Sequence, residues 1–174
     1  LAIAGRSPVE AIDLSPNDGS GTIESLALQV ERAASELLAK AGGGKLDLVG
    51  FSMGALVSRY WVQRMSGKTR VRRFVSISGP HAGTMTAFAV SKPGVVQMRP
   101  RSPLLAELDA DPDPWGEVEV HTMWTPYDLM IVPPRSSRLR GAVRDHCLRI
   151  ALHRWMITHP RAIETVVSIL REPG

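Results

Sequence analysis

The sequence predicts an α/β fold in which a parallel sheet is flanked by helices, within a single domain spanning residues 1–174. Short runs rich in β-branched residues alternate with stretches of helical hydrophobic periodicity, which is the pattern of parallel strands joined by helical crossovers. One such run ends in a G-x-S-x-G sequence that leads directly into a helical stretch. No linker, internal repeat or low-complexity tract divides the chain.

Five short apolar runs are expected to form the strands. In chain order they cover residues 9–14, 46–50, 71–78, 117–124 and 146–152.

Helices are expected between these strands. Apolar residues keep helical spacing over 23–41 and stop at a run of three glycines. A second helix is expected over 53–65, with Gly67 placed to terminate it. A helical turn is expected over 103–108 and a last helix over 160–171, which starts with a proline suited to its first turn.

Composition and charge favour an ordinary globular protein. Hydrophobic residues make up 44% of the chain and charged residues 22%, with a net charge of +4. Arginines gather in two clusters that could meet nucleic acid or anionic lipid. We interpret them as solvated surface, because acidic residues are interspersed and no nucleic-acid-binding motif accompanies them. The clusters comprise Arg70, Arg72 and Arg73, and Arg135, Arg138, Arg140 and Arg144.

The sequence also gives expectations about disulfides, membrane spans and a signal peptide. Cys147 excludes a disulfide within the chain, and its apolar surroundings favour a buried structural thiol. No run reaches the roughly 20 apolar residues of a spanning helix. Residues 1–8 contain no signal-peptide core, and the sequence indicates no compartment.

Ser52 is the expected nucleophile. It lies in Gly50-Phe51-Ser52-Met53-Gly54, between a buried strand and a helix, which is the context of a nucleophile elbow. The elbow strains the serine backbone and requires glycines where strand and helix approach closely. The backbone N–H of Met53, at the helix N-terminus, is the expected oxyanion donor.

The residues around Ser52 resemble a known family. The run LDLVGFSMGALVSRY, residues 46–60, looks like the elbow of small bacterial triacylglycerol lipases of the α/β-hydrolase superfamily, although Ala55 stands where many relatives carry glycine. The segment SGPHAGT, residues 78–84, resembles the P-H-x-G-T segment that follows the next strand in those lipases. The resemblance covers nearly the whole chain and implies an esterase or lipase with a Ser-Asp-His triad.

His153 is the expected general base. The chain order in this fold is Ser, then Asp or Glu, then His, and His153 follows the last predicted strand. Its segment, HRWMITHPRA over residues 153–162, also resembles the catalytic-histidine segment of those lipases. The other four histidines are assigned to loop anchoring, to strands or to helix capping, namely His81, His121, His146 and His159.

Asp128 is the expected acid of the triad. It follows the fourth predicted strand, in a segment that resembles the catalytic-acid loop of the family. Asp145 is the alternative. Three aspartates among prolines are interpreted as turn formers, namely Asp109, Asp111 and Asp113. The apolar residues of the connection over 84–103 fit either core packing or an acyl pocket or mobile cover.

The chain departs from the lipases at its N-terminus. By resemblance, residues 1–8 look like the tail of a helix, and no His-Gly sequence supplies a second oxyanion donor. The fold is therefore expected to be N-terminally shortened, and the strand at 46–50 lacks a neighbour. Either residues 9–14 pair with that strand or a segment of another chain does, because an open edge favours self-association.

The sequence thus predicts a serine carboxylic-ester hydrolase that works through an acyl-enzyme and needs no metal or organic cofactor. Its expected partners are a small ester or lipid substrate and a transient lipid surface, with no nucleic acid. Two alternatives remain open: an acyltransferase on the same triad, and an inactive hydrolase-like fragment that acts as a binding module.

Overall fold

The computed structural model describes residues 8–172 and contains a four-stranded parallel sheet. The strands lie side by side in chain order: β1 (Leu46–Phe51), β2 (Val71–Ile77), β3 (Glu119–Trp124) and β4 (Arg144–Cys147). Because all four run in the same direction, the loops that follow them meet at one edge of the sheet.

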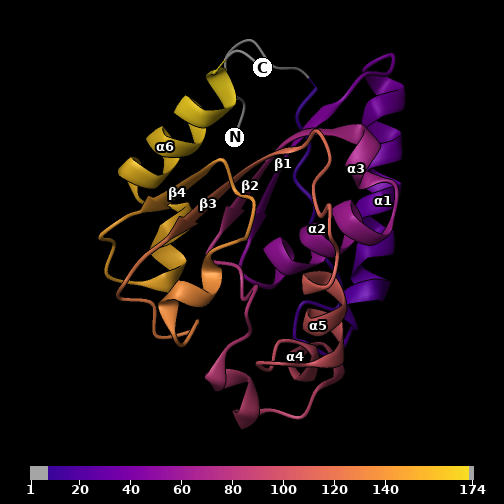
Figure 1. Cartoon of the computed structure of the whole chain (residues 1–174). Helices are drawn as coiled ribbons and strands as arrows, with labels where there is room; N and C mark the ends of the chain where they lie inside the picture. The colour runs from indigo at the N-terminus through magenta and orange to yellow at the C-terminus, as the bar shows by residue number, and fades with distance from the viewer. Residues whose placement is uncertain (1–7, 173–174) are drawn as a thin grey trace.

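Helices cover both faces of the sheet (Figure 1). One face packs against α1 (Ile23–Lys40) and α2 (Met53–Arg64), and a core around Leu26, Trp61 and Phe74 fills the space between them. Helix α6 (Pro160–Arg171) covers the other face. Within the described residues, no helix combines the length and the hydrophobicity that a bilayer span requires.

Short helices form most of the remaining connections. These are α3 (Gly67–Arg70), α4 (Pro93–Gln97) and α5 (Pro103–Asp109), with 3₁₀ turns η1 (Met85–Ala89), η2 (Pro134–Ser137) and η3 (His153–Ile157). The predicted helices lie within a residue or so of those observed. Gly67, however, begins α3 instead of ending α2. A Cβ there would lie 2.7 Å from the Cα of Val62, so the position needs the smallest residue.

The strand predicted over residues 9–14 is wrong. These residues form no regular secondary structure and are mostly exposed. Residues 8–12 line a groove of about 650 Å³ that runs along β1 between α1 and α6. Alternating apolar residues alone do not make a strand, since it must also find a hydrogen-bonding partner. Within residues 8–172, β1 pairs with β2 alone, so its pairing with another chain stays a prediction.

The last strand is displaced toward the N-terminus of the predicted run. Strand β4 covers Arg144–Cys147, whereas residues 148–152 form no strand, although the N–H of Leu148 still donates to the carbonyl of Trp124 at 2.8 Å. Cys147 is exposed, so the expected buried thiol is wrong. The reason is that β4 lies at the sheet edge and only His146 among its residues is partly buried.

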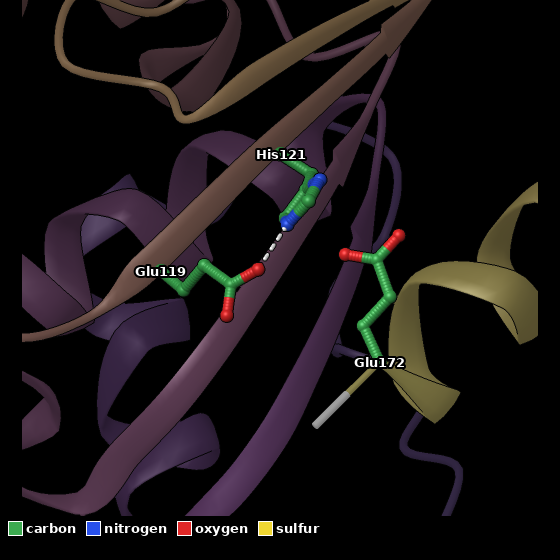
Figure 2. A group of neighbouring side chains, drawn as sticks. All are labelled: Glu119, His121 and Glu172. Atoms are coloured by element: carbon green, nitrogen blue, oxygen red, sulfur yellow. Dashed lines mark hydrogen bonds and ion pairs between the residues drawn. The ribbon is translucent and has the colours of Figure 1, made fainter. Parts of the chain in front are cut away.

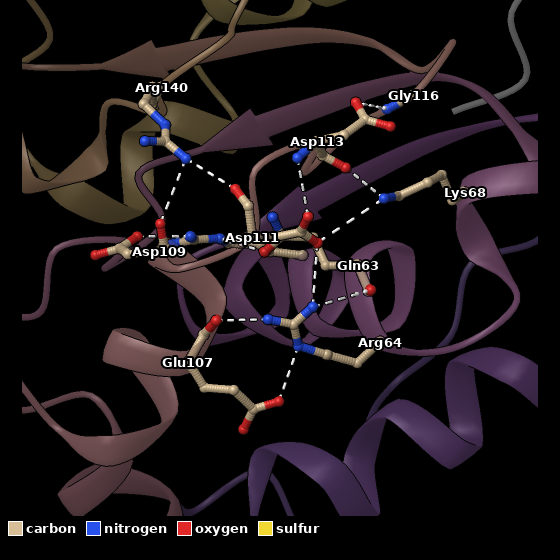
Figure 3. A network of polar contacts seen from close by, with 10 residues as sticks. Gln63, Arg64, Lys68, Glu107, Asp109, Asp111, Asp113, Gly116 and Arg140 are labelled. Carbon is tan, nitrogen blue, oxygen red and sulfur yellow. Dashed lines mark hydrogen bonds and ion pairs between the residues drawn. The ribbon is translucent and has the colours of Figure 1, made fainter.

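A polar network fastens α5 and the connection that follows it to helix α2 (Figure 3). Arg64 donates to Glu107 at 2.8 Å and to Asp111 at 3.1 Å, and the buried Arg59 pairs with Asp109 at 2.7 Å. Asp111 also accepts the backbone N–H of Asp113. Asp111 and Asp113 thus act as the turn formers that the sequence predicts. The pairs with arginine were not expected, because they join residues more than 40 positions apart.

Arg73 corrects the interpretation of the arginine clusters as solvated surface. Its side chain is fully buried and bonds to Glu119 at 2.6 Å and to the carbonyl of Ile169 in α6 at 2.6 Å. The guanidinium therefore joins β2 to β3 and to the cover helix. Charged side chains are rarely buried unless they are paired in this way.

We predict that Arg73→Met lowers the free energy of unfolding by about 3–5 kcal/mol, because it leaves Glu119 as a part-buried carboxylate without its cation. The matched control is Arg144→Met, since Arg144 is mostly exposed and its carboxylate partner lies 3.7 Å away. That variant should lose less than about 1 kcal/mol. Urea denaturation measures both, and equal losses would contradict the structural role of Arg73.

Candidate active site

The expected nucleophile lies on the sharp turn between β1 and α2. Ser52 has φ 53° and ψ −126°, a backbone conformation that a residue with a side chain rarely adopts. Its N–H donates to the carbonyl of Ile77 at the end of β2, at 2.9 Å. Helix α2 begins at the next residue, Met53. The first N–H groups of the helix therefore lie beside the serine, where they favour negative charge.

The two glycines of the motif differ in what they contribute. A Cβ on Gly50 would lie 2.7 Å from the Cα of Ala55 and 2.9 Å from the hydroxyl of Ser58, so α2 can approach β1 only because Gly50 has no side chain. A Cβ on Gly54 would meet nothing within 4 Å among the described residues. The expectation that close approach requires both glycines is thus correct for Gly50 and wrong for Gly54.

Ser52, His153 and Asp128 form one hydrogen-bonded chain. The Nε2 atom of His153 lies 2.9 Å from the Ser52 hydroxyl oxygen, and its Nδ1 lies 2.7 Å from Asp128 Oδ2. The three residues follow β1, β4 and β3, so the parallel sheet brings them to the same edge. The imidazole is partly buried and its ring packs against Phe51, with the ring centroids 4.8 Å apart.

Asp128 is held as a carboxylate. Burial alone would raise its pKa, but hydrogen bonds from His153 and from the backbone N–H groups of Ile131 and Met130 outweigh burial and hold the pKa below its usual value. Both N–H groups bind the second oxygen, Oδ1, at 2.9 Å. One oxygen thus fixes the loop while the other faces the imidazole, which is the arrangement that orients a general base.

The alternative residues lie elsewhere. Asp145 binds Thr122 at 2.6 Å and Arg138 at 2.6 Å and does not contact His153. His81 is buried beside Ser76, with its Nε2 2.6 Å from the hydroxyl, and burial lowers its pKa well below the usual value. His159 caps α6 by accepting the N–H of Arg161, as the sequence predicts.

Two contributors to the site were not anticipated. The backbone N–H groups of Met130 and Ile131 carry no sequence signal, because any residue other than proline supplies one. Phe51, in contrast, occupies the first variable position of G-x-S-x-G, so its place beside the nucleophile could have been anticipated.

Met85, Phe88 and Val90 in the 84–103 connection are exposed, which excludes core packing for them.

Three residues of the kinds that commonly bind metal ions lie close together. Single ligand atoms of Glu119, His121 and Glu172 lie within 4.8 Å of one another (Figure 2). The cluster lies at the start of β3, at the sheet edge opposite Ser52. His121 Nε2 bonds to Glu119 at 2.7 Å, and Arg73 already pairs with the same carboxylate. Because a buried guanidinium repels a second cation, we assign this cluster to the ion-pair network that joins β2, β3 and α6.

A family model supplies the identification. The model of the palmitoyl protein thioesterase family matches residues 7–127, more than half of the chain. The chain belongs to this family. The match contains the Ser52 elbow and ends one residue before Asp128. A search of curated proteins found no significant match.

Solved structures show the fold of this family member to be that of the α/β-hydrolases, as the sequence predicts. Lipase B of Aspergillus fumigatus superimposes with a TM-score of 0.79 at 16% identity, over 91% of this chain and 44% of the lipase. A Bacillus licheniformis lipase in its propeptide form gives 0.74 at 14% identity, over 89% and 42%. A Listeria innocua gene product gives 0.66 at 20% identity, over 88% and 68%. The chain therefore spans less than half of the two lipases.

We predict that Gly50→Ala destabilises this thioesterase-family protein by about 1–3 kcal/mol, because a Cβ forces α2 away from β1. The matched control is Gly54→Ala, at a helical position with open space. It should leave the free energy of unfolding unchanged or raise it by up to about 1 kcal/mol. Denaturant titration checks both variants, and equal destabilisation would contradict the stated difference between the glycines.

We also predict a pH-dependent difference in stability between the wild type and Asp128→Asn. The lowered pKa of Asp128 in the folded state means that its carboxylate stabilises the fold above its unfolded pKa of about 3.9. This contribution is lost as the pH falls through the folded-state value. The stability advantage of the wild type should therefore shrink below about pH 4. An advantage that stays constant down to about pH 2 would contradict the assignment.

Proposed function

We propose that the protein is a serine hydrolase that cleaves carboxylic esters through an acyl-enzyme. The observation that carries the proposal is the hydrogen-bonded chain from Ser52 through His153 to Asp128, with distances of 2.9 and 2.7 Å. The order of the three residues along the chain, Ser, Asp, His, is the order found in α/β-hydrolases.

The positions of these atoms support a two-step mechanism for the proposed reaction. The Ser52 hydroxyl attacks the acyl carbonyl while His153 Nε2 accepts its proton. Asp128 holds Nδ1 of the imidazole and stabilises the cation that forms. His153 then returns the proton to the leaving alcohol, and the ester C–O bond breaks to leave an acyl-serine. Water, deprotonated by His153, hydrolyses the acyl-enzyme and releases the acid.

The negative charge of the tetrahedral intermediate falls beside the start of α2. We assign the backbone N–H of Met53 as one oxyanion donor, because it belongs to the residue after the nucleophile and opens the helix. Removing a single oxyanion donor typically lowers turnover by about 10²–10³-fold. The strained backbone of Ser52 therefore has two uses: it exposes the hydroxyl and aligns the helix N-terminus with the developing charge.

Thioester hydrolysis is the second candidate, and family membership favours it. The same acyl-enzyme forms, but a thiolate leaves in place of an alkoxide and needs less help from the general acid. Parallel assays with an oxyester and a thioester of the same acyl chain distinguish the two. Added alcohol distinguishes hydrolysis from acyl transfer, because transfer produces a new ester.

We predict that Ser52→Ala lowers kcat for short p-nitrophenyl esters by at least about 10⁴-fold, and that Asp128→Asn lowers it by about 10⁴-fold. The control is Ser168→Ala, because Ser168 is exposed on α6, and this variant should keep wild-type turnover. Circular dichroism checks that each variant is folded. Activity of Ser52→Ala within about tenfold of the wild type would refute the nucleophile assignment.

A further inference from the structure

An exposed apolar patch lies beside the loop that holds Asp128. We define the patch as Met85, Phe88, Leu129 and Met130, whose relative exposures are 54%, 55%, 78% and 57%. Large apolar side chains grouped on one surface usually mark an interaction site. The patch lies on two loops, the one that follows β2 and the one that follows β3.

Hydrogen bonds join these two loops into one surface. The hydroxyls of Thr84 and Thr86 both donate to the carbonyl of Met130, at 2.8 and 2.7 Å. The N–H of Met85 donates to the carbonyl of Val132 at 2.8 Å. The four apolar side chains therefore project from two loops that hydrogen bonds hold together, and not from two separate loops.

The patch is also tied to the site. Asp128 Oδ1 accepts the N–H groups of Met130 and Ile131, while Oδ2 faces His153. Along the chain, Leu129 stands between Asp128 and the two residues whose N–H groups bind its carboxylate. The most exposed apolar side chain of the patch therefore belongs to the turn that holds Asp128. Anything that the patch binds is thus brought to the edge of the sheet where Ser52 lies.

The charged residues of the loops at this edge of the sheet are nearly all basic. The loops that follow β2, β3 and β4 span residues 79–102, 125–138 and 148–160, and their only acidic residue is the buried Asp128. They carry seven basic residues: Lys92, Arg99, Arg101, Arg135, Arg138, Arg149 and Arg154.

Only two of these seven are neutralised within residues 8–172. Lys92 pairs with Asp18 and Arg138 pairs with Asp145. Arg99 lies over the ring of Phe88, 5.1 Å from its centroid, so positive charge borders the patch directly. An apolar surface that Arg99 borders, on loops that carry further arginines without an ion pair, is complementary to a layer of anionic headgroups above acyl chains.

We propose that this patch and the arginines of the same edge loops dock the protein onto an anionic lipid bilayer, with the four apolar side chains inserted among the acyl chains. The inference rests on the proposed function for its purpose, namely the presentation of lipid-borne acyl groups to Ser52. Docking itself does not require turnover, and the two can be tested separately.

The test is flotation of the Ser52→Ala protein with vesicles, so that hydrolysis cannot alter the lipid. We expect binding to vesicles of mixed phosphatidylglycerol and phosphatidylcholine, weakened by added salt, and at least about tenfold weaker binding to phosphatidylcholine alone. Equal binding to both, or no binding to either, would overturn the proposal, whatever the esterase assays of the wild type show.

Variants in the same Ser52→Ala background test the surface itself. Leu129→Ser should weaken binding about tenfold, because it removes an inserting apolar side chain. Its control is Leu28→Ser, an exposed leucine of α1 that lies outside the patch. Arg135→Gln and Arg149→Gln should each weaken binding about fivefold, whereas Arg32→Gln on α1 should not.

Soluble substrate completes the test in the otherwise wild-type protein. Phe88→Ser, a change outside the turn that holds Asp128, should hydrolyse a short soluble ester at the wild-type rate but lose activity on vesicle-borne esters. If the control variants weakened vesicle binding as much as Leu129→Ser and Arg135→Gln do, the binding would be general adsorption of a basic protein and the proposal would be wrong. An equal loss of soluble and vesicle-borne turnover would likewise contradict docking as the role of this surface.

Discussion

The close contact between β1 and α2 is the constraint on which the rest of the site depends. Because Gly50 has no side chain, Ala55 can pack against the strand, and the chain must turn within one residue. That turn holds Ser52 at positive φ and places the start of α2 directly beside it. Such strain persists only where the surrounding structure enforces it, here the cores packed on β1 and α2.

The parallel sheet converts this local feature into a site. Loops after β1, β3 and β4 contribute the serine, the aspartate and the histidine, although the serine and histidine lie 101 residues apart. Buried polar groups keep the sheet and its connections in register. Arg73 joins β2 and β3 to α6, and Arg64 with Asp111 holds the long connection before β3 against α2. Ion pairs far from the site thus join the elements that carry its loops.

Much of this organisation could be predicted from the sequence, for identifiable reasons. Helix α1 and helix α6 show clear hydrophobic periodicity, and the elbow has a local motif with its flanking strand and helix. The geometry of Ser52, Asp128 and His153 agrees with the predicted order, while their catalytic roles remain our proposal. The strand over residues 9–14 was mispredicted because pairing is a non-local property, and the burial of Arg73 was missed because Glu119 lies 46 residues away.

Covalent capture of the nucleophile tests the central claim most directly. A phosphonate ester mimics the tetrahedral intermediate and reacts only with a serine that is activated by its base and oxyanion donor. Intact-mass spectrometry should show one adduct per chain, and peptide mapping should place it on Ser52. The adduct should not form on Asp128→Asn protein at a comparable rate. A folded wild-type protein that remains unlabelled, or that carries the adduct on another residue, would contradict the account.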